Sequence, residues 1–236
     1  MTAATTKSDF WRGLRDGSPF ILAVMPFGLL FGALATEAGL DFFQVMSMSI
    51  LVIAGAAQFT ALAQMQDAAP VALVVAAALM VNMRMAMYSA SLAPHLGAAP
   101  LWQRAVAAYI LVDNTYAVAI SEYERNPENS SRRKVAYYFG SAVPSWVFWY
   151  FSTFLGAYLG QSIPPEWALD FAVPIAFIAI FAPLLRTIAH VAAALTSIII
   201  ALFLAFLPYS IGLFIAAGLA MVVGAEVERR TMAGAS

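Results

Sequence analysis

Long apolar stretches, joined by short polar connections, follow one another along almost the whole of this chain. A helix that crosses a bilayer needs about 20 predominantly apolar residues. The stretches that reach about this length lie at approximately 18–36, 43–64, 70–92, 102–122, 138–160, 167–186, 188–207 and 209–225. They are continuously apolar and do not alternate every second residue, which argues for helices and against a β-barrel. The sequence therefore predicts an all-α polytopic membrane protein with about eight transmembrane helices.

The composition supports this class and excludes several functions. The chain is 62% hydrophobic and 11% charged, with a mean hydropathy of +0.81, whereas soluble domains carry about 25% charged residues. A net charge of −1 argues against a nucleic-acid-binding surface. There is no cysteine, and the two histidines, His95 and His190, lie far apart in the sequence. Since P-loop, serine-hydrolase and zinc-protease motifs are also missing from the sequence, we expect no enzyme activity, no metal and no cofactor.

The distribution of basic residues predicts an orientation. If the N-terminus is cytoplasmic and eight spans alternate, only Arg104 lies outside and only Arg84 lies within a span. The other ten of the twelve basic residues then lie on the cytoplasmic side, namely Lys7, Arg12, Arg15, Arg125, Arg132, Arg133, Lys134, Arg186, Arg229 and Arg230. Basic residues are enriched in cytoplasmic loops of membrane proteins. We therefore expect both termini to be cytoplasmic.

The longest polar segment divides the chain into two halves. It predicts one membrane transport domain over residues 1–236, with halves at about 18–122 and 138–226 and a cytoplasmic connector at about 123–135. A faint repeat accompanies this division. Each half has a Gly-x-x-x-Gly pair followed by a Glu-x-x-x-Asp-Phe pattern, at Gly28–Phe42 and Gly156–Phe171. The pattern indicates two parallel four-helix repeats, or a chance recurrence of a common helix-packing pair.

Two charges lie deep within the apolar runs. Arg84 lies ten residues before Pro94, and Asp113 lies eleven residues after Trp102. At about 1.5 Å per residue, both fall near the middle of a bilayer if the connection between them is at the membrane surface. A charge at this depth costs from about 3 kcal/mol upward and needs a partner. The pair either binds substrate, with Arg84 holding a carboxylate and Asp113 titrating, or is an ion pair that fixes the two helices.

Three polar side chains extend this candidate site. Asn82 and Asn114 flank the charges, and Gln58 lies in the small-residue stretch Ala54–Phe59. Small residues allow a close helix contact, or allow a helix to unwind and present its backbone to a ligand. The amides bind substrate in one interpretation and join neighbouring helices in the other. Methionine- and alanine-rich faces would accept an apolar substrate group.

Four segments together carry a resemblance to a known family. PFGLLFG (Pro26–Gly32), AGAAQF (Ala54–Phe59), VNMRMAMYSASLAPHL (Val81–Leu96) and LVDNTYA (Leu111–Ala117) resemble, in their order and spacing, the AzlC family of bacterial membrane proteins. The resemblance implies the large subunit of a branched-chain amino-acid exporter in the bacterial inner membrane. It also implies a small four-span partner of the AzlD type.

One position departs from the family pattern. The acidic residue of the fourth segment is commonly followed by a second acid in the family, and here Asn114 takes that place. An ion-coupling role that needs two carboxylates is therefore in doubt. Two other functions remain open. One is a channel or transporter for another small solute. The other is a membrane subunit that does not itself transport.

Overall fold

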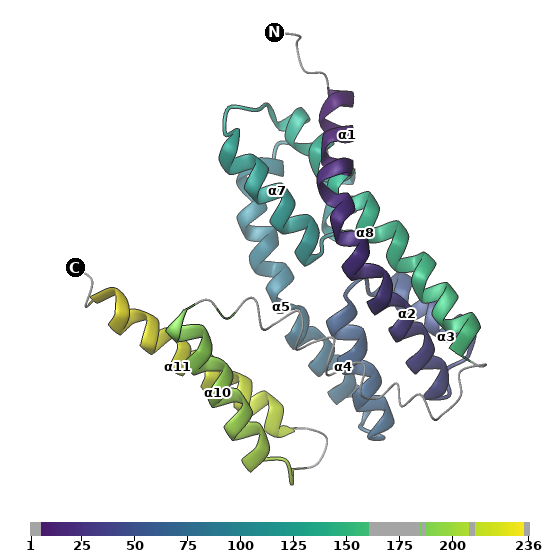
Figure 1. Cartoon of the computed structure of the whole chain (residues 1–236), viewed down its shortest axis with the longest axis vertical. Helices are drawn as coiled ribbons and strands as arrows, with labels where there is room; N and C mark the ends of the chain where they lie inside the picture. The colour runs from purple at the N-terminus through teal and green to yellow at the C-terminus, as the bar shows by residue number, and fades with distance from the viewer. Residues whose placement is uncertain (1–5, 161–184, 186, 208–210, 234–236) are drawn as a thin grey trace. The chain divides into compact units, whose positions relative to one another are not determined.

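The computed structural model describes all residues except 1–5, 161–184, 186, 208–210 and 234–236 (Figure 1). Its helices are α1 (Thr6–Gly17), the 3-10 turn η1 (Ser18–Phe20), α2 (Ile21–Glu37), α3 (Phe42–Leu51), α4 (Gly55–Gln66), α5 (Val71–Leu96), α6 (Leu101–Tyr109), α7 (Asp113–Arg125), α8 (Ser131–Gly160), α10 (Ile188–Phe203) and α11 (Ile211–Ala233). Among the described residues the regular structure is helical, and three segments are long and apolar enough to cross a membrane: Thr6–Glu37, Val71–Leu96 and Ile211–Thr231. The predicted all-α membrane class is confirmed.

The chain forms two compact units. Unit 1 comprises Met1–Leu62 and Ala78–Trp167, and unit 2 comprises Ala63–Ala77 and Ala168–Ser236. In unit 2, α10 and α11 pack antiparallel: a Cβ on Gly224 would lie 3.1 Å from the Cβ of Ala193. Several predictions concern residues outside the described ones. They are the span at 167–186, the cytoplasmic position of Arg186, the end of the second repeat copy, and the number of spans in this part of the chain.

The frame of unit 1 is a pair of long parallel helical segments. The nearly continuous segment α1–η1–α2 lies alongside α8 for most of its length (Figure 1). The two backbones touch: a Cβ on Gly32 would lie 2.3 Å from the Thr153 carbonyl oxygen, and one on Gly156 would lie 2.0 Å from the Leu29 carbonyl oxygen. Glycine is needed at these two positions because any side chain would separate the helices. The glycine pairs predicted as packing faces therefore pack against one another.

A first helical hairpin occupies residues 42–66, where a single span at 43–64 was predicted. The helix breaks after Leu51 and resumes at Gly55. The side-chain amide of Gln58 in α4 hydrogen-bonds Ser49 Oγ of α3 at 3.0 Å, so the two helices lie side by side. The prediction of one continuous helix here is wrong. Figure 1 shows α3 and α4 at the end of unit 1 where α2 ends.

A second hairpin occupies residues 101–125, where a span at 102–122 was predicted. The helix breaks between Tyr109 and Asp113, and each helix contacts the beginning of α8. Tyr138 donates its hydroxyl to the carbonyl of Ala107 in α6 at 2.8 Å. Tyr123, near the end of α7, donates to the carbonyl of Lys134 at 2.8 Å. The segment thus begins and ends at the same end of unit 1, beside the first turns of α8. The prediction of one helix that crosses the membrane here is wrong.

The tips of the two hairpins meet in unit 1, where Tyr109 and Ile50 are partly exposed. The Tyr109 hydroxyl at the end of α6 donates to the carbonyl of Ile50 near the end of α3, at 2.6 Å. Ile53, in the break of the first hairpin, packs against a buried cluster that includes Ile110 and Leu111 in the break of the second. The hairpins therefore approach each other from opposite ends of the frame.

These hairpins reverse the expected direction of α5. Its last turn lies beside the first turn of α8: the Lys134 ammonium is 3.3 Å from His95 Nδ1, and the Ser131 hydroxyl is 3.5 Å from the His95 carbonyl oxygen. The connection 97–100 and Arg104 consequently lie at the same end as the connector. The prediction that they lie on the opposite side is wrong, because a hairpin that returns to its own side does not alternate the orientation of the next helix. Arg104 therefore lies at the same end of unit 1 as the basic residues of the connector, Arg132, Arg133 and Lys134.

Candidate functional site

The two deep charges predicted from the sequence form an ion pair. Arg84 Nη2 lies 3.1 Å from Asp113 Oδ2, and the two side chains are 30% and 43% exposed in the isolated chain. Arg84 is 13 residues from the start of α5 at Val71 and 12 from its end at Leu96, so it lies about 18–20 Å from each end. The pair therefore lies near the middle of the longest spanning helix of the site.

The pairing arises from a geometry that differs from the expected one. α5 and α7 run parallel, because contacts advance along both helices together: Arg84 meets Asp113, Tyr88 stacks on Tyr116, and His95 meets Tyr123. Asp113 is the first residue of α7, directly after the hairpin break. A carboxylate is favoured there because the first turn of a helix presents unpaired N–H groups.

Tyr88 completes the environment of Asp113. Its hydroxyl donates to Asp113 Oδ1 at 2.9 Å, so both carboxylate oxygens have a partner on α5. The Tyr88 ring stacks on the Tyr116 ring, with centroids 4.2 Å apart and planes 12° apart, and the Tyr116 hydroxyl lies 3.1 Å from Ser91 Oγ. These contacts continue the polar face of α5 and α7 from the ion pair toward the end that carries Lys134.

The ion pair leaves hydrogen-bonding capacity unused. Within the described residues, Arg84 Nε is buried without a partner, and so is Oδ1 of Asn82, two residues earlier in α5. Asn114 is the second residue of α7 and is half-buried. These two asparagines therefore lie on the helices that form the pair, as the sequence predicts, and the Arg84 guanidinium has a donor that Asp113 does not use.

Gln58 has a different role from the other candidates. Its side chain is 0% exposed, and it hydrogen-bonds Ser49 within the first hairpin. With the amide turned by 180°, Nε2 donates to the carbonyl of Val52 at 3.2 Å, in the break between α3 and α4, and Oε1 accepts from the Ser49 hydroxyl at 3.0 Å. Both arrangements join the two helices of the hairpin. This geometry favours the helix-joining interpretation of Gln58, although the adjacent small-residue stretch does coincide with a break in the helix.

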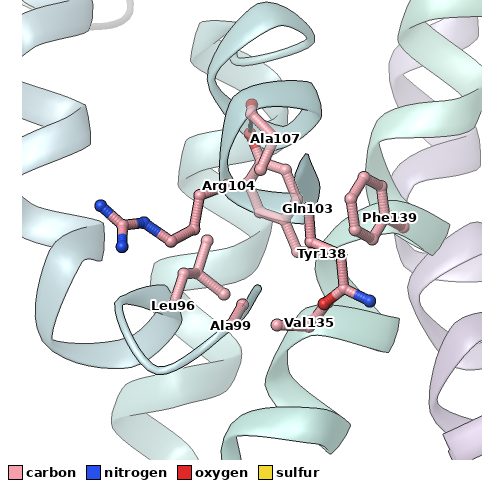
Figure 2. Close-up of a pocket in the computed structure, with 8 residues that line it drawn as sticks. All are labelled: Leu96, Ala99, Gln103, Arg104, Ala107, Val135, Tyr138 and Phe139. Atoms are coloured by element: carbon pink, nitrogen blue, oxygen red, sulfur yellow. Dashed lines mark hydrogen bonds between the residues drawn. The ribbon is translucent and has the colours of Figure 1, made fainter. Parts of the chain in front are cut away.

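A small hollow lies away from the ion pair, at the end of unit 1 where α6 begins. It is shallow and partly open, with room for about 10 Å³, and its lining is Leu96, Ala99, Gln103, Arg104, Ala107, Val135, Tyr138 and Phe139 (Figure 2). In Figure 2 the Arg104 guanidinium points away from the Tyr138 and Val135 side chains. The lining is mainly apolar and places no charge inside the hollow.

Charged contacts fasten this same end of unit 1. Arg133 pairs with the buried carboxylate of Asp9, with Nε 2.7 Å from Oδ2. Arg12 pairs with Glu122, which ties α1 to α7. Lys134 is buried and donates to the carbonyl of Pro127 at 3.0 Å. The cluster joins helices and, among the described residues, no group of three or more His, Cys, Asp or Glu side chains is placed to hold a metal.

Sequence reasoning missed Tyr88, Tyr116 and Tyr109. Tyr88 lies four residues after Arg84, which places both on one face of a helix, so this spacing was a usable signal. Tyr116 follows Asp113 by three residues and gives the same signal on α7. Tyr109 carries no local signal, since its partner, the Ile50 carbonyl, is 59 residues away.

Comparison with known proteins points to one family. A family model described as "AzlC protein" matches residues 19–163, which contain both hairpins and the ion pair. No solved structure matches this chain significantly.

Curated relatives are membrane proteins of similar length. The "Inner membrane protein YgaZ" of Escherichia coli K12 is 27% identical over 185 residues, covering 74% of this chain and 72% of the relative. An "Uncharacterized membrane protein" of Archaeoglobus fulgidus is 26% identical over 206 residues, covering 86% and 87%. One of Helicobacter pylori J99 is 24% identical over 178 residues, covering 73% and 76%.

Proposed function

This chain belongs to the AzlC family and is a membrane protein with a transporter-like role; from that premise we propose that it exports leucine, isoleucine and valine. The observation that supports a transport site is the Arg84–Asp113 pair at the start of a half-length helix. Helices interrupted near the middle of the membrane present charged groups and unpaired backbone groups to small solutes.

The pair matches the chemistry of a zwitterion. An amino acid offers one carboxylate and one ammonium, and Arg84 and Asp113 offer the complementary charges side by side. Inserting the substrate replaces one ion pair by two, so no charge remains unpaired deep in the membrane, where it would be costly. Asn82 and Asn114 supply further hydrogen-bonding groups, and Met85, packed against the core beside Arg84, offers a polarizable surface for a branched side chain.

We further propose the cellular setting. The name of the Escherichia coli relative supports an inner-membrane location. The end of unit 1 that carries Arg104 and the connector would face the cytoplasm, following the positive-inside pattern. A small four-span partner of the AzlD type would complete the exporter, and its requirement is tested by expressing the chain with and without it.

Export from cells loaded with leucine, isoleucine or valine tests the function. We expect Arg84→Ala and Asp113→Asn to abolish export at normal protein levels, because each leaves one charge of the substrate unpaired. Arg104→Ala is the matched control, since it removes an exposed arginine away from the pair, and export should continue. Export at the parental rate in both pair variants would refute the proposed site. Parental membranes that exchange none of the three amino acids in counterflow would refute the substrate class.

Proton coupling through Asp113 is a separate part of the proposal. The carboxylate is the acidic group of the pair and would take up and release the proton. Export that is insensitive to an imposed pH gradient would exclude it, while leaving amino-acid export intact.

A further inference from the structure

A hydrogen bond from Tyr109 joins the two hairpin tips. Its hydroxyl donates to the Ile50 carbonyl at 2.6 Å. The Tyr150 hydroxyl of α8 lies 2.8 Å from the Tyr109 hydroxyl. Because the Tyr109 proton is directed at Ile50, Tyr150 is the donor in this second bond. One side chain therefore connects α3, α6 and α8.

The bond satisfies a carbonyl that the helix break leaves unpaired. In a continuous helix the Ile50 carbonyl would accept from the N–H of Ala54. Here the Ala54 N–H donates instead to the carbonyl of Val52 at 2.9 Å. An unpaired carbonyl is strongly disfavoured inside a membrane, where water is scarce. Tyr109 therefore stabilises the arrangement in which the tips are together.

A second tyrosine makes the same kind of bond in a different setting. Tyr138 donates to the carbonyl of Ala107 in the last turn of α6, at 2.8 Å. Its side chain is 1% exposed, whereas Tyr109 is 45% exposed. Tyr138 fixes α6 to α8 within the core, but Tyr109 joins one hairpin to the other at an accessible position. Both are bonds from a tyrosine hydroxyl to a backbone carbonyl, but the Tyr138 bond joins α8 to α6 and the Tyr109 bond joins α6 to α3.

We propose that Tyr109 is a positioning residue that holds the hairpin tips together and keeps Asp113 beside Arg84, and that the tips part when its bond to Ile50 opens. Tyr109 ends α6 and Asp113 begins α7, with only three residues between them. A displacement of the second hairpin's tip therefore also displaces the Asp113 carboxylate. The proposal rests on the proposed transport site, whose charges it positions.

Cysteine labelling tests this arrangement directly. The chain has no cysteine, so Ile53→Cys places a single thiol in the break of the first hairpin, against the buried cluster that includes Ile110 and Leu111 of the second break. In the background of Tyr109→Phe we expect the thiol to react roughly fivefold faster with a small water-soluble reagent, which is the shift in an equilibrium expected from the loss of one hydrogen bond. Tyr109→Met, which also lacks the hydroxyl, should give the same change.

Two matched controls separate this role from a general loss of packing. Tyr150→Phe removes a hydrogen bond at the same place but leaves the Tyr109–Ile50 bond, and Tyr138→Phe removes a hydroxyl-to-carbonyl bond that does not join the hairpins. Both should label at the parental rate. In export assays, Tyr109→Phe should raise the leucine concentration that gives half-maximal rate and keep the maximal rate, because fewer molecules have Asp113 positioned beside Arg84.

Equal labelling of the parental and Tyr109→Phe proteins, or equal acceleration in the Tyr138→Phe control, would overturn the proposal. The labelling result does not depend on any substrate. Faster labelling in Tyr109→Phe together with no amino-acid export by the parental chain would leave Tyr109 as the link between the tips and would refute the proposed substrate instead.

Discussion

At the scale of single residues, the carboxylate of Asp113 is held by two groups of α5. Arg84 neutralises its charge, and Tyr88 fixes its orientation through the second oxygen. The Tyr88 ring is in turn held against Tyr116. An ion pair alone permits rotation of the carboxylate, whereas the added hydroxyl restricts it to one direction.

Tyr88→Phe removes this hydroxyl and keeps the stacked ring. Hydrogen bonds to charged groups contribute about 1.5–3 kcal/mol. The pair is partly exposed, which reduces this contribution. We therefore expect a roughly tenfold weaker apparent affinity for substrate at unchanged protein level. Substrate-concentration dependence of export measures it. Tyr158→Phe, at a tyrosine that is 68% exposed, serves as the control. An apparent affinity within twofold of the parental value in Tyr88→Phe would show that Tyr88 does not position Asp113.

The sequence predicts part of this site, for a clear physical reason. Charges in an apolar run need a partner, and Arg84 and Asp113 are the two that lie deepest, so their pairing follows from the cost of burial. Gln58 shows the limit of this reasoning. An amide in an apolar helix also needs a partner, but the sequence does not reveal whether the partner is a ligand or, as here, Ser49 in a facing helix.

At the scale of the helices, the contact between α2 and α8 depends on glycine. A Cβ on Gly156 would lie 2.0 Å from a backbone oxygen of Leu29, and backbone atoms cannot move aside as a flexible side chain does. The same substitution elsewhere has no such consequence: a Cβ on Gly218 of α11 meets nothing within 4 Å.

Gly156→Ala should therefore lower the unfolding temperature of the purified protein. Overpacking costs about 1–3 kcal/mol, which corresponds to a decrease of roughly 2–12 °C for a chain of this size. Gly218→Ala is the matched control and should leave the unfolding temperature unchanged or slightly higher, because alanine favours helix. Thermal unfolding in detergent provides the measurement. Equal unfolding temperatures for the two variants would argue against the tight α2–α8 contact.

Local patterns give only weak signals for the two helix breaks. The residues between α3 and α4 are Val52, Ile53 and Ala54, and those between α6 and α7 are Ile110, Leu111 and Val112. All six residues are apolar. Hydropathy averaged along the sequence therefore predicts one continuous span for each hairpin. The breaks are stabilised by distant side chains, such as Tyr109 for the first. Two local signals accompany the breaks. Asp113-Asn114-Thr115 is one, since such polar residues often start helices, and the small residues Ala54-Gly55-Ala56-Ala57 at the first break are the other.

At the scale of the whole molecule, the two hairpins change the path of the chain through the membrane. Each hairpin returns to the end from which it starts, so α5 crosses in the direction opposite to that expected from eight alternating spans. The basic residues of unit 1 outside Arg84 then gather at one end, with Arg104 among them. The charge pattern is thereby stronger than the sequence analysis indicated, although the predicted path through the hairpins was wrong.

Single cysteines test this path in intact cells. Ala98→Cys and Glu128→Cys lie in exposed connections at the basic end of unit 1, and Glu37→Cys is exposed at the opposite end, where α2 finishes. A membrane-impermeant maleimide should label only the Glu37→Cys protein from outside, and a permeant maleimide should label all three. Labelling of Ala98→Cys from outside, with Glu128→Cys protected, would show that residues 101–125 cross the membrane.

The alignment of α1 and α2 with α8 also has a consequence for biosynthesis. The Asp9–Arg133 pair joins residues 124 positions apart, and ribosomes add about 5–20 residues per second. About 6–25 s therefore pass between the synthesis of α1 and that of the first turn of α8, against which α1 packs. Until then its small-residue face is open to lipid or to the insertion machinery, and the hairpins lack the frame that supports their breaks. Nascent chains of this protein are thus committed to the membrane well before they are able to acquire their native packing.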